Sequence, residues 1–312
     1  MKHYLFLIVV ICFCFATNAQ NYKGVIGKHE IFMSLEIDAE NGDILYAYYF
    51  YNSQLKNIFL EGTNESSNLT LYETYSDVED EKELFKLKMK DDVITGSWTN
   101  NGEILPVLLT KTTTDLNSYR LSKTTFIRDS ISTHHNKELV WFTEKYSKTH
   151  LFRLGNGFSK AEREFLNPVL DSIHTKYAGF EFECNSLSLS IEVALISKKY
   201  ISFTEYSSID CGGAHPTHRT IGYNFDLKNK RVLDRLTDVY PGIDHYKLLK
   251  NKYSNDADLE VECEYFTDNS DYWKYYTWVF TNNGVDITPS YPHAMTPCET
   301  AFPITYKEIQ LR

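Results

Sequence analysis

Hydrophobic and polar residues alternate over short stretches in the first half of the mature chain, from Gln20 to about Lys111. The clearest stretch is Leu84 to Met89, where apolar residues alternate with lysines, as in an antiparallel strand with one buried face. The stretch Ile44 to Tyr51 is apolar at nearly every position, which predicts a strand covered on both faces. The Asn41-Gly42 pair between such stretches predicts a tight hairpin turn.

Seven or eight such stretches follow one another in this half, separated by brief turns. Antiparallel strands in this order close into an up-and-down barrel or a closed meander, which removes exposed sheet edges. We therefore predict a β-rich, barrel-like domain over residues 20–111, followed by a polar linker from Thr112 to Asn117.

The second half, residues 118–312, combines strands with two predicted helices. One helix follows the capping motif that begins at Ser159, although Pro168 should kink it or mark its true start. The other runs from Ile243 to Tyr253. Because strands and helices are segregated rather than regularly alternating, the second domain is predicted as α+β with an antiparallel sheet. The fold class of the whole chain is mainly β.

Between the two helices, leucine, isoleucine and valine alternate with serine from Ser186 to Leu195, and a second strand follows. If Leu195 lies opposite Ile201, the register brings Cys184 and Cys211 within one residue of alignment. A single bulge near Gly212-Gly213 would then bring the two sulfurs together. This favours a Cys184–Cys211 disulfide and, by elimination, Cys263–Cys298.

The segment Asp210-Cys-Gly-Gly-Ala-His-Pro216 lies between two predicted strands. Two consecutive glycines predict a sharp turn or a bulge, because glycine adopts positive φ without strain. Cys211, His215 and His218 could together bind a metal ion, but their spacing matches no standard zinc motif. We therefore predict disulfides rather than a metal site, and no cofactor.

Residues 1–19 have the layout of a secretory signal peptide: a short basic start, an apolar core and small residues before Ala19. Four cysteines remain after cleavage, and all lie in the second half. An even number of cysteines in an exported protein favours disulfides. We therefore expect a periplasmic or secreted protein with no membrane span after cleavage.

The chain has a formal net charge of −10, and its acidic residues gather in runs at 77–81 and 256–262. Nucleic acid is excluded as a partner because phosphate binding requires a basic surface. A cationic partner would instead be attracted.

The segment from Cys211 to Pro216, followed by Tyr223-Asn-Phe-Asp-Leu, resembles the signature of the RsiV C-terminal-like domain family. The ending from Phe280 to Ala294, which includes Tyr291, and the strand around Pro303 resemble the same family. The resemblance covers about residues 180–312. It implies an extracytoplasmic recognition domain, with lysozyme or cell-wall peptidoglycan as the ligand. The chain lacks the membrane span of an anti-sigma factor and the catalytic motif of a polysaccharide deacetylase.

Three functions follow as hypotheses, of which the third is an inert structural module of a larger envelope assembly. The first is a non-catalytic binding protein, whose candidate binding residues surround the double-glycine turn and the family's closing motif: Gly212, Gly213, Ala214, His215, His218 and Tyr291. The second is a cell-envelope hydrolase that uses Asp210, His215 and His218 for acid–base chemistry. Neither a Gly-x-Ser-x-Gly elbow nor a His-Glu-x-x-His motif occurs in the sequence, which favours the first hypothesis.

Overall fold

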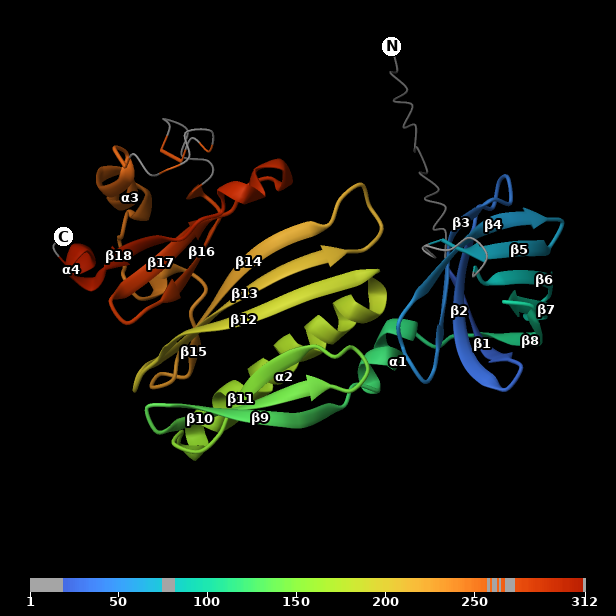
Figure 1. Cartoon of the computed structure of the whole chain (residues 1–312), viewed down its shortest axis with the longest axis horizontal. Helices are drawn as coiled ribbons and strands as arrows, with labels where there is room; N and C mark the ends of the chain where they lie inside the picture. The colour runs from blue at the N-terminus through green and yellow to red at the C-terminus, as the bar shows by residue number, and fades with distance from the viewer. Residues whose placement is uncertain are drawn as a thin grey trace, which may run out of the picture. The chain divides into compact units, whose positions relative to one another are not determined.

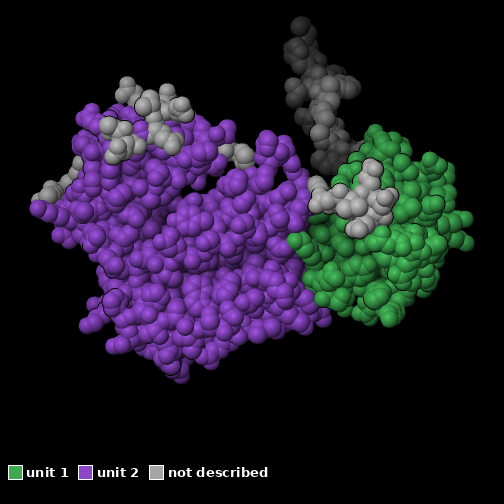
Figure 2. Space-filling view, in the orientation of Figure 1, with its two compact units in different colours: residues 1–119 green, residues 120–312 purple. Residues whose placement is uncertain are grey.

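The structure is a computed structural model of the chain, and it describes residues 19–74, 82–256, 259, 263, 265, 266 and 273–310, with only the backbone of residue 293. The chain divides into two compact units, residues 1–119 and 120–312 (Figure 2). The apolar part of the predicted signal peptide, the acidic run at 77–81 and most of the run at 256–262 lie outside the described residues.

Unit 1 is a closed barrel in which each strand pairs with the next and β8 pairs back with β1 (Figure 1). This confirms the barrel predicted from the strand pattern. Its strands are β1 (Gln20–Ile26), β2 (His29–Ile37), β3 (Ile44–Tyr51), β4 (Ile58–Glu65), β5 (Asn68–Glu73), β6 (Leu84–Lys90), β7 (Val93–Asn100) and β8 (Glu103–Thr112).

The barrel interior is filled by alternate side chains of every strand, among them Met33, Tyr49 and Phe85, all fully buried. Two local predictions need correction. β2 and β3 are joined by a six-residue loop rather than by a tight Asn41-Gly42 turn. β3 is covered on its outer face only in part, since Phe50 is buried there whereas Tyr46 is 44% exposed.

The described residues of unit 2 form three antiparallel sheets (Figure 1). The first consists of β9 (Phe126–His134), β10 (Lys137–Glu144) and β11 (His150–Leu154). The second consists of β12 (Ser186–Ile196), β13 (Tyr200–Asp210), β14 (Thr217–Asp226) and β15 (Arg231–Val232). The third consists of β16 (Tyr276–Phe280), β17 (Gly284–Pro289) and β18 (Phe302–Thr305).

Four α-helices occur in the described residues: α1 (Leu116–Ser122), α2 (Lys160–Glu183), α3 (His245–Tyr253) and α4 (Tyr306–Gln310). The capping motif predicted at Ser159 is confirmed, because its side chain accepts from the backbone of Glu162 while the Glu162 carboxylate accepts from Ser159. The alternative that α2 begins at Pro168 is wrong, since the helix continues through this residue. α2 shares one hydrophobic core with the first and second sheets.

The long hairpin β12–β13 has the predicted pairing of Val193 with Phe203, but Leu195 lies opposite Ser202 rather than Ile201. The irregularity in the register therefore lies between Val193 and Leu195, at the end of the hairpin far from Gly212. Both predicted disulfides are present, Cys184–Cys211 and Cys263–Cys298. Disulfides are typical of proteins outside the cytoplasm.

The third sheet packs with α3 and the Cys263–Cys298 disulfide around a second core rich in aromatic rings. Tyr200 at the start of β13 stacks on Phe280 of β16, with ring centroids 4.3 Å apart, which joins the second and third sheets. Among the described residues, no helix combines the length and the apolar character that crossing a membrane requires.

Candidate functional site

The second sheet has two faces of opposite character because side chains alternate along each strand. The face toward α2 is largely apolar and carries residues such as Phe203, which is fully buried. The other face carries hydroxyl groups in cross-strand rows. One row consists of Ser188, Ser208 and His218, and the next consists of Ser190, Tyr206 and Thr220.

This hydroxyl-bearing face forms the floor of an open cavity of about 480 Å³, which we call the polar groove. Its wall is formed by the 3-10 helix η5 (His293–Cys298) and the residue after it, through Thr296, Pro297 and Glu299. A narrower cavity of about 70 Å³ shares Tyr206 and Thr220 with the groove. The polar groove thus extends along the sheet toward β16 and β17.

Three carboxyl groups line these two cavities. Burial raises the pKa of Glu299, and the backbone N–H of Tyr291 and the charge of His218 oppose this effect. Burial also raises the pKa of Asp286, and repulsion from Glu192 adds to the increase. The polar groove therefore combines neutral hydroxyls with carboxylates that are only partly solvated.

The ring of Tyr206 lines the groove and is 44% exposed. Burial of its hydroxyl raises its pKa, and the nearby Glu192 and Asp286 contribute to the increase. Its hydroxyl thus remains a neutral donor at physiological pH, next to two acceptors. The ring itself offers an apolar surface in an otherwise polar cavity.

A buried carboxylate supports the groove from the opposite face of the sheet. Glu205 is fully buried and accepts hydrogen bonds from Arg219 at 2.7 Å and from Tyr177 at 2.8 Å. Ser207 and Tyr223 also donate to it, at 2.8 and 3.0 Å. Burial and the neighbouring Glu205 raise the pKa of Tyr223 to about 12. Because Glu205 precedes Tyr206 on β13, this cluster fixes the strand that carries the exposed ring.

The double-glycine turn lies at the end of the β13–β14 hairpin, and Gly212, Gly213, Ala214 and His215 are all exposed there. Gly212 has a φ of 80°, and its N–H donates to Asp210 at 3.0 Å. The left-handed φ confirms the sharp turn predicted for this position.

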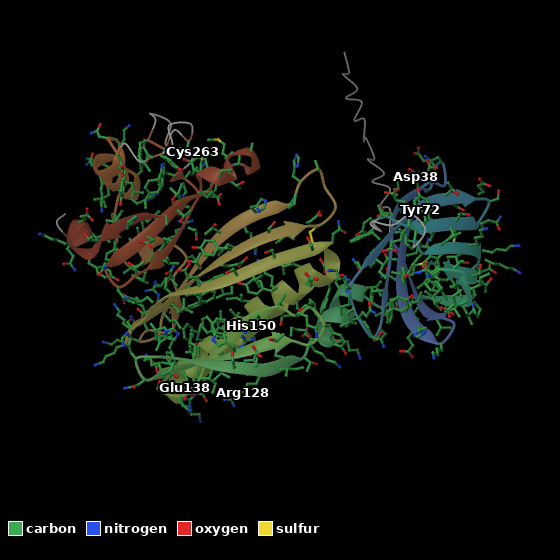
Figure 3. All side chains as sticks on the ribbon, viewed as in Figure 1. Asp38, Tyr72, Arg128, Glu138, His150 and Cys263 are labelled. Carbon is green, nitrogen blue, oxygen red and sulfur yellow. A yellow bond between two sulfur atoms is a disulfide. The ribbon has the colours of Figure 1, made fainter. Side chains whose placement is uncertain are left out.

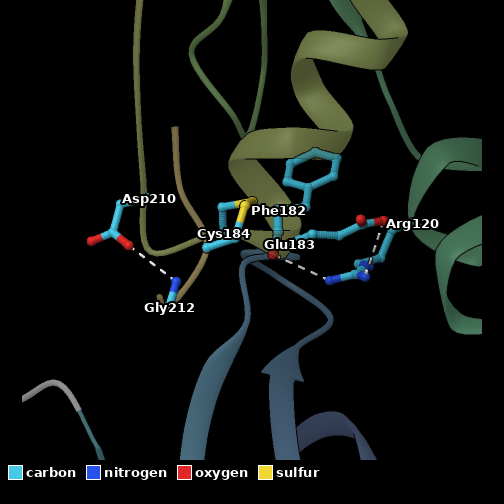
Figure 4. The surroundings of a disulfide bond; sticks show 7 residues. Arg120, Phe182, Glu183, Cys184, Asp210 and Gly212 are labelled. Carbon is cyan, nitrogen blue, oxygen red and sulfur yellow. Dashed lines mark hydrogen bonds and ion pairs between the residues drawn. A yellow bond between two sulfur atoms is a disulfide. The ribbon is translucent and has the colours of Figure 1, made fainter. Parts of the chain in front are cut away.

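Figure 4 shows how the turn is tied to the end of α2 through Cys184–Cys211. The buried Arg120 stabilises the same helix end, since its guanidinium donates to the carbonyl of Phe182 at 3.2 Å and lies 3.8 Å from Glu183. A cation at a helix C-terminus is electrostatically favourable. The disulfide and Arg120 therefore hold the base of the turn against the end of α2.

Of the residues predicted to bind or react, His218 lines the polar groove, whereas Asp210 and His215 belong to the hairpin end. Tyr291 is only 6% exposed, and its hydroxyl donates to the carbonyl of Cys263 at 3.4 Å. Its side chain therefore belongs to the core, and its backbone positions Glu299. Cys211 forms a disulfide, so its sulfur cannot bind a metal ion together with His215 and His218. The described part of the chain contains no group of three or more His, Cys, Asp or Glu side chains suited to a metal ion.

The sequence pattern did not predict that Tyr206, Ser208 and Glu299 line a groove. The alternating serines of β12 were the available signal, since a solvent face made of small hydroxyls differs from the charged face of an ordinary exposed strand. Glu299 lies far along the chain from β12, and only the packing of η5 brings it to the groove.

No protein-family model matches this chain, and a search of curated proteins finds no significant match. The class that the fold defines is therefore a mainly β protein of two units with two disulfides.

Proposed function

We propose that this protein is a periplasmic or secreted binding protein of the cell envelope and that its polar groove binds cell-wall glycan. The observation that carries the proposal is the dense set of hydroxyl groups on the groove floor. They come from Ser188, Ser190, Tyr206, Ser208 and Thr220. Sugars present many hydroxyls that donate and accept hydrogen bonds, and such a floor matches them.

The dimensions and the ring of Tyr206 support the same ligand class. A cavity of about 480 Å³ lies within the range of small-molecule sites. The exposed ring provides a flat apolar surface against which the C–H face of a sugar can pack. Glu299 provides an acceptor on the opposite wall. The resemblance to the RsiV C-terminal-like domain, over about residues 180–312, also supports an envelope ligand.

The test is sedimentation of purified protein with insoluble peptidoglycan. We expect the wild type to sediment and Tyr206→Ala to bind about tenfold more weakly, since stacked rings of this kind contribute on the order of 1 kcal/mol or more. Tyr275→Ala is the matched control, because Tyr275 is 67% exposed and lies outside the groove lining. Unchanged sedimentation of Tyr206→Ala would refute the assignment of the groove.

Lysozyme is the other ligand that the resemblance implies, and the same protein can be tested with it by a size-exclusion shift. A cationic protein would be attracted to a chain of net charge −10. A shift with lysozyme that Tyr206→Ala abolishes, without sedimentation on peptidoglycan, would assign the groove to lysozyme instead.

A hydrolase is the second candidate function, and the proximity of His218 to Glu299 favours it. These two residues line the groove together, and the charge of His218 lowers the pKa that burial raises at Glu299. Such a pair could act as a general acid and base. Release of soluble fragments from peptidoglycan by the wild type, but not by His218→Ala, would establish this function in place of simple binding.

A further inference from the structure

The outer surface of the barrel carries a cluster of aromatic rings that contributes nothing to the barrel interior. Tyr46, Tyr48 and Phe59 lie on β3 and β4, with centroid separations of 5.5, 6.1 and 6.4 Å among the three rings. Tyr72 on the neighbouring strand β5 is 41% exposed (Figure 3). The interior core contains the alternate residues of these strands, such as Ala47 and Leu71.

Carboxylates alternate with these rings across the strands. Glu36 pairs with Tyr46 between β2 and β3, and Glu61 pairs with Tyr72 between β4 and β5. Extending the pairing of Ala47 with Leu60 by one residue places Tyr46 opposite Glu61. Directly opposed side chains have Cβ atoms about 5 Å apart, so Tyr46 and Tyr72 each have a carboxylate beside them. We call these six residues the aromatic–acidic patch: Glu36, Tyr46, Tyr48, Phe59, Glu61 and Tyr72.

The charge of the whole barrel has the same sign as the patch. Residues 20–112 contain 8 Lys and no Arg against 16 Asp and Glu, a formal charge of −8 out of −10 for the chain. A surface of this kind attracts cations over distances of about 10 Å at moderate ionic strength. At contact, a Lys or Arg side chain is held both by the face of a tyrosine ring and by the adjacent carboxylate.

We propose that the aromatic–acidic patch docks a Lys- or Arg-rich polypeptide segment of a partner protein. The alternation of rings and carboxylates across the strands supports a polypeptide as the ligand, since a polypeptide can present several cations in succession along such a row. A neutral glycan would gain only hydrogen bonds, and no charge attraction, from Glu36 and Glu61, and an anionic surface would be repelled by them. This site is distinct from the polar groove, which lies in the other unit.

The test measures the binding of fluorescein-labelled octalysine to the full mature chain by fluorescence anisotropy, at low and at high salt. Two double variants separate the two parts of the patch: Glu36→Gln with Glu61→Gln removes its charge, and Tyr46→Ser with Tyr72→Ser removes its exposed rings. We expect either variant to weaken binding about tenfold, and added salt to weaken binding to the wild type. Thermal melts confirm that each variant is folded.

Matched controls carry losses of the same kind elsewhere. Glu103→Gln with Glu164→Gln removes two exposed charges outside the patch, and Tyr275→Ser removes an exposed ring. Both controls, and Tyr206→Ala in the groove, should keep binding within about twofold of the wild type. The proposal is overturned if octalysine does not bind, if the charge control weakens binding as much as the patch variant, or if the ring variant binds normally. A patch variant that loses peptidoglycan but not octalysine would instead make the patch a glycan surface.

Discussion

Replacing Glu205 tests whether its buried cluster supports the sheet beneath the polar groove. The Glu205→Leu substitution leaves Arg219 without its carboxylate partner and removes the acceptor of Tyr177, Tyr223 and Ser207. Breaking a buried ion pair from one side costs about 3–5 kcal/mol, and each buried donor left unpaired adds about 1–3 kcal/mol. The side chain of Arg219 is 26% exposed, so water recovers part of its loss. We therefore expect a net loss of at least about 4 kcal/mol.

Glu205→Gln keeps the volume and one acceptor oxygen, so we expect about half of that loss. The matched control is Glu164→Leu, since Glu164 is exposed on α2 and forms a surface i,i+4 pair with Lys160. This control should stay within about 0.5 kcal/mol of the parent.

The assay is urea unfolding followed by tryptophan fluorescence in a Trp98→Phe background. The chain has four tryptophans, and Trp98 is the one that lies in the barrel. The three remaining tryptophans then report unit 2 alone, which avoids mixing the transitions of the two units. The extrapolated free energy of unfolding carries an error of about 1 kcal/mol. If the value for Glu205→Leu lies within about 1 kcal/mol of the parent's, the cluster does not support the sheet.

Three further predictions concern stability. Burial lowers the pKa of His174 to about 4, so between about pH 6.5 and 4 this side chain is neutral in the folded state and protonated in the unfolded state. The free energy of unfolding should therefore fall by about 3 kcal/mol as the pH drops from about 6.5 towards 4. His174→Gln should flatten this dependence in urea titrations at several pH values. Replacing Cys184 and Cys211 together by serine opens a loop with a sequence separation of 27, and urea titration should show a loss of about 3.5 kcal/mol in the free energy of unfolding. Ser159→Ala removes the cap that pairs with Glu162 and should cost about 1 kcal/mol in the same assay.

The strand pattern was sufficient to predict the barrel because each strand pairs with its neighbour in the sequence. Alternation around Leu84 to Met89 and turn residues between strands contain nearly all the information that such a topology requires. The loop between β2 and β3 differed because Asp38 organises it together with Asn41: Asp38 accepts from the backbone of Glu40 and its own N–H donates to the carbonyl of Asp43, whereas the Asn41 side chain accepts from the N–H of Asp43.

The disulfide of the hairpin could be predicted because the register of β12 and β13 is set by apolar residues that face α2. The exact register near Leu195 could not, because the irregularity there lets Ile196 rather than Leu195 face Ile201. The polar groove could not be predicted from the sequence, for a different reason. Its wall and its floor lie 76 to 111 residues apart along the chain (296 − 220 and 299 − 188), and only the packing of η5 against β14 brings them together.

Hydrogen–deuterium exchange of the full mature chain with soluble peptidoglycan fragments tests the central claim, namely that the polar groove binds cell-wall glycan. The account predicts slower exchange in β13, β14 and η5, around Tyr206 and Thr296, and no change in the barrel. Saturating fragments that leave these three elements unchanged, or that slow exchange only in the barrel, would contradict it.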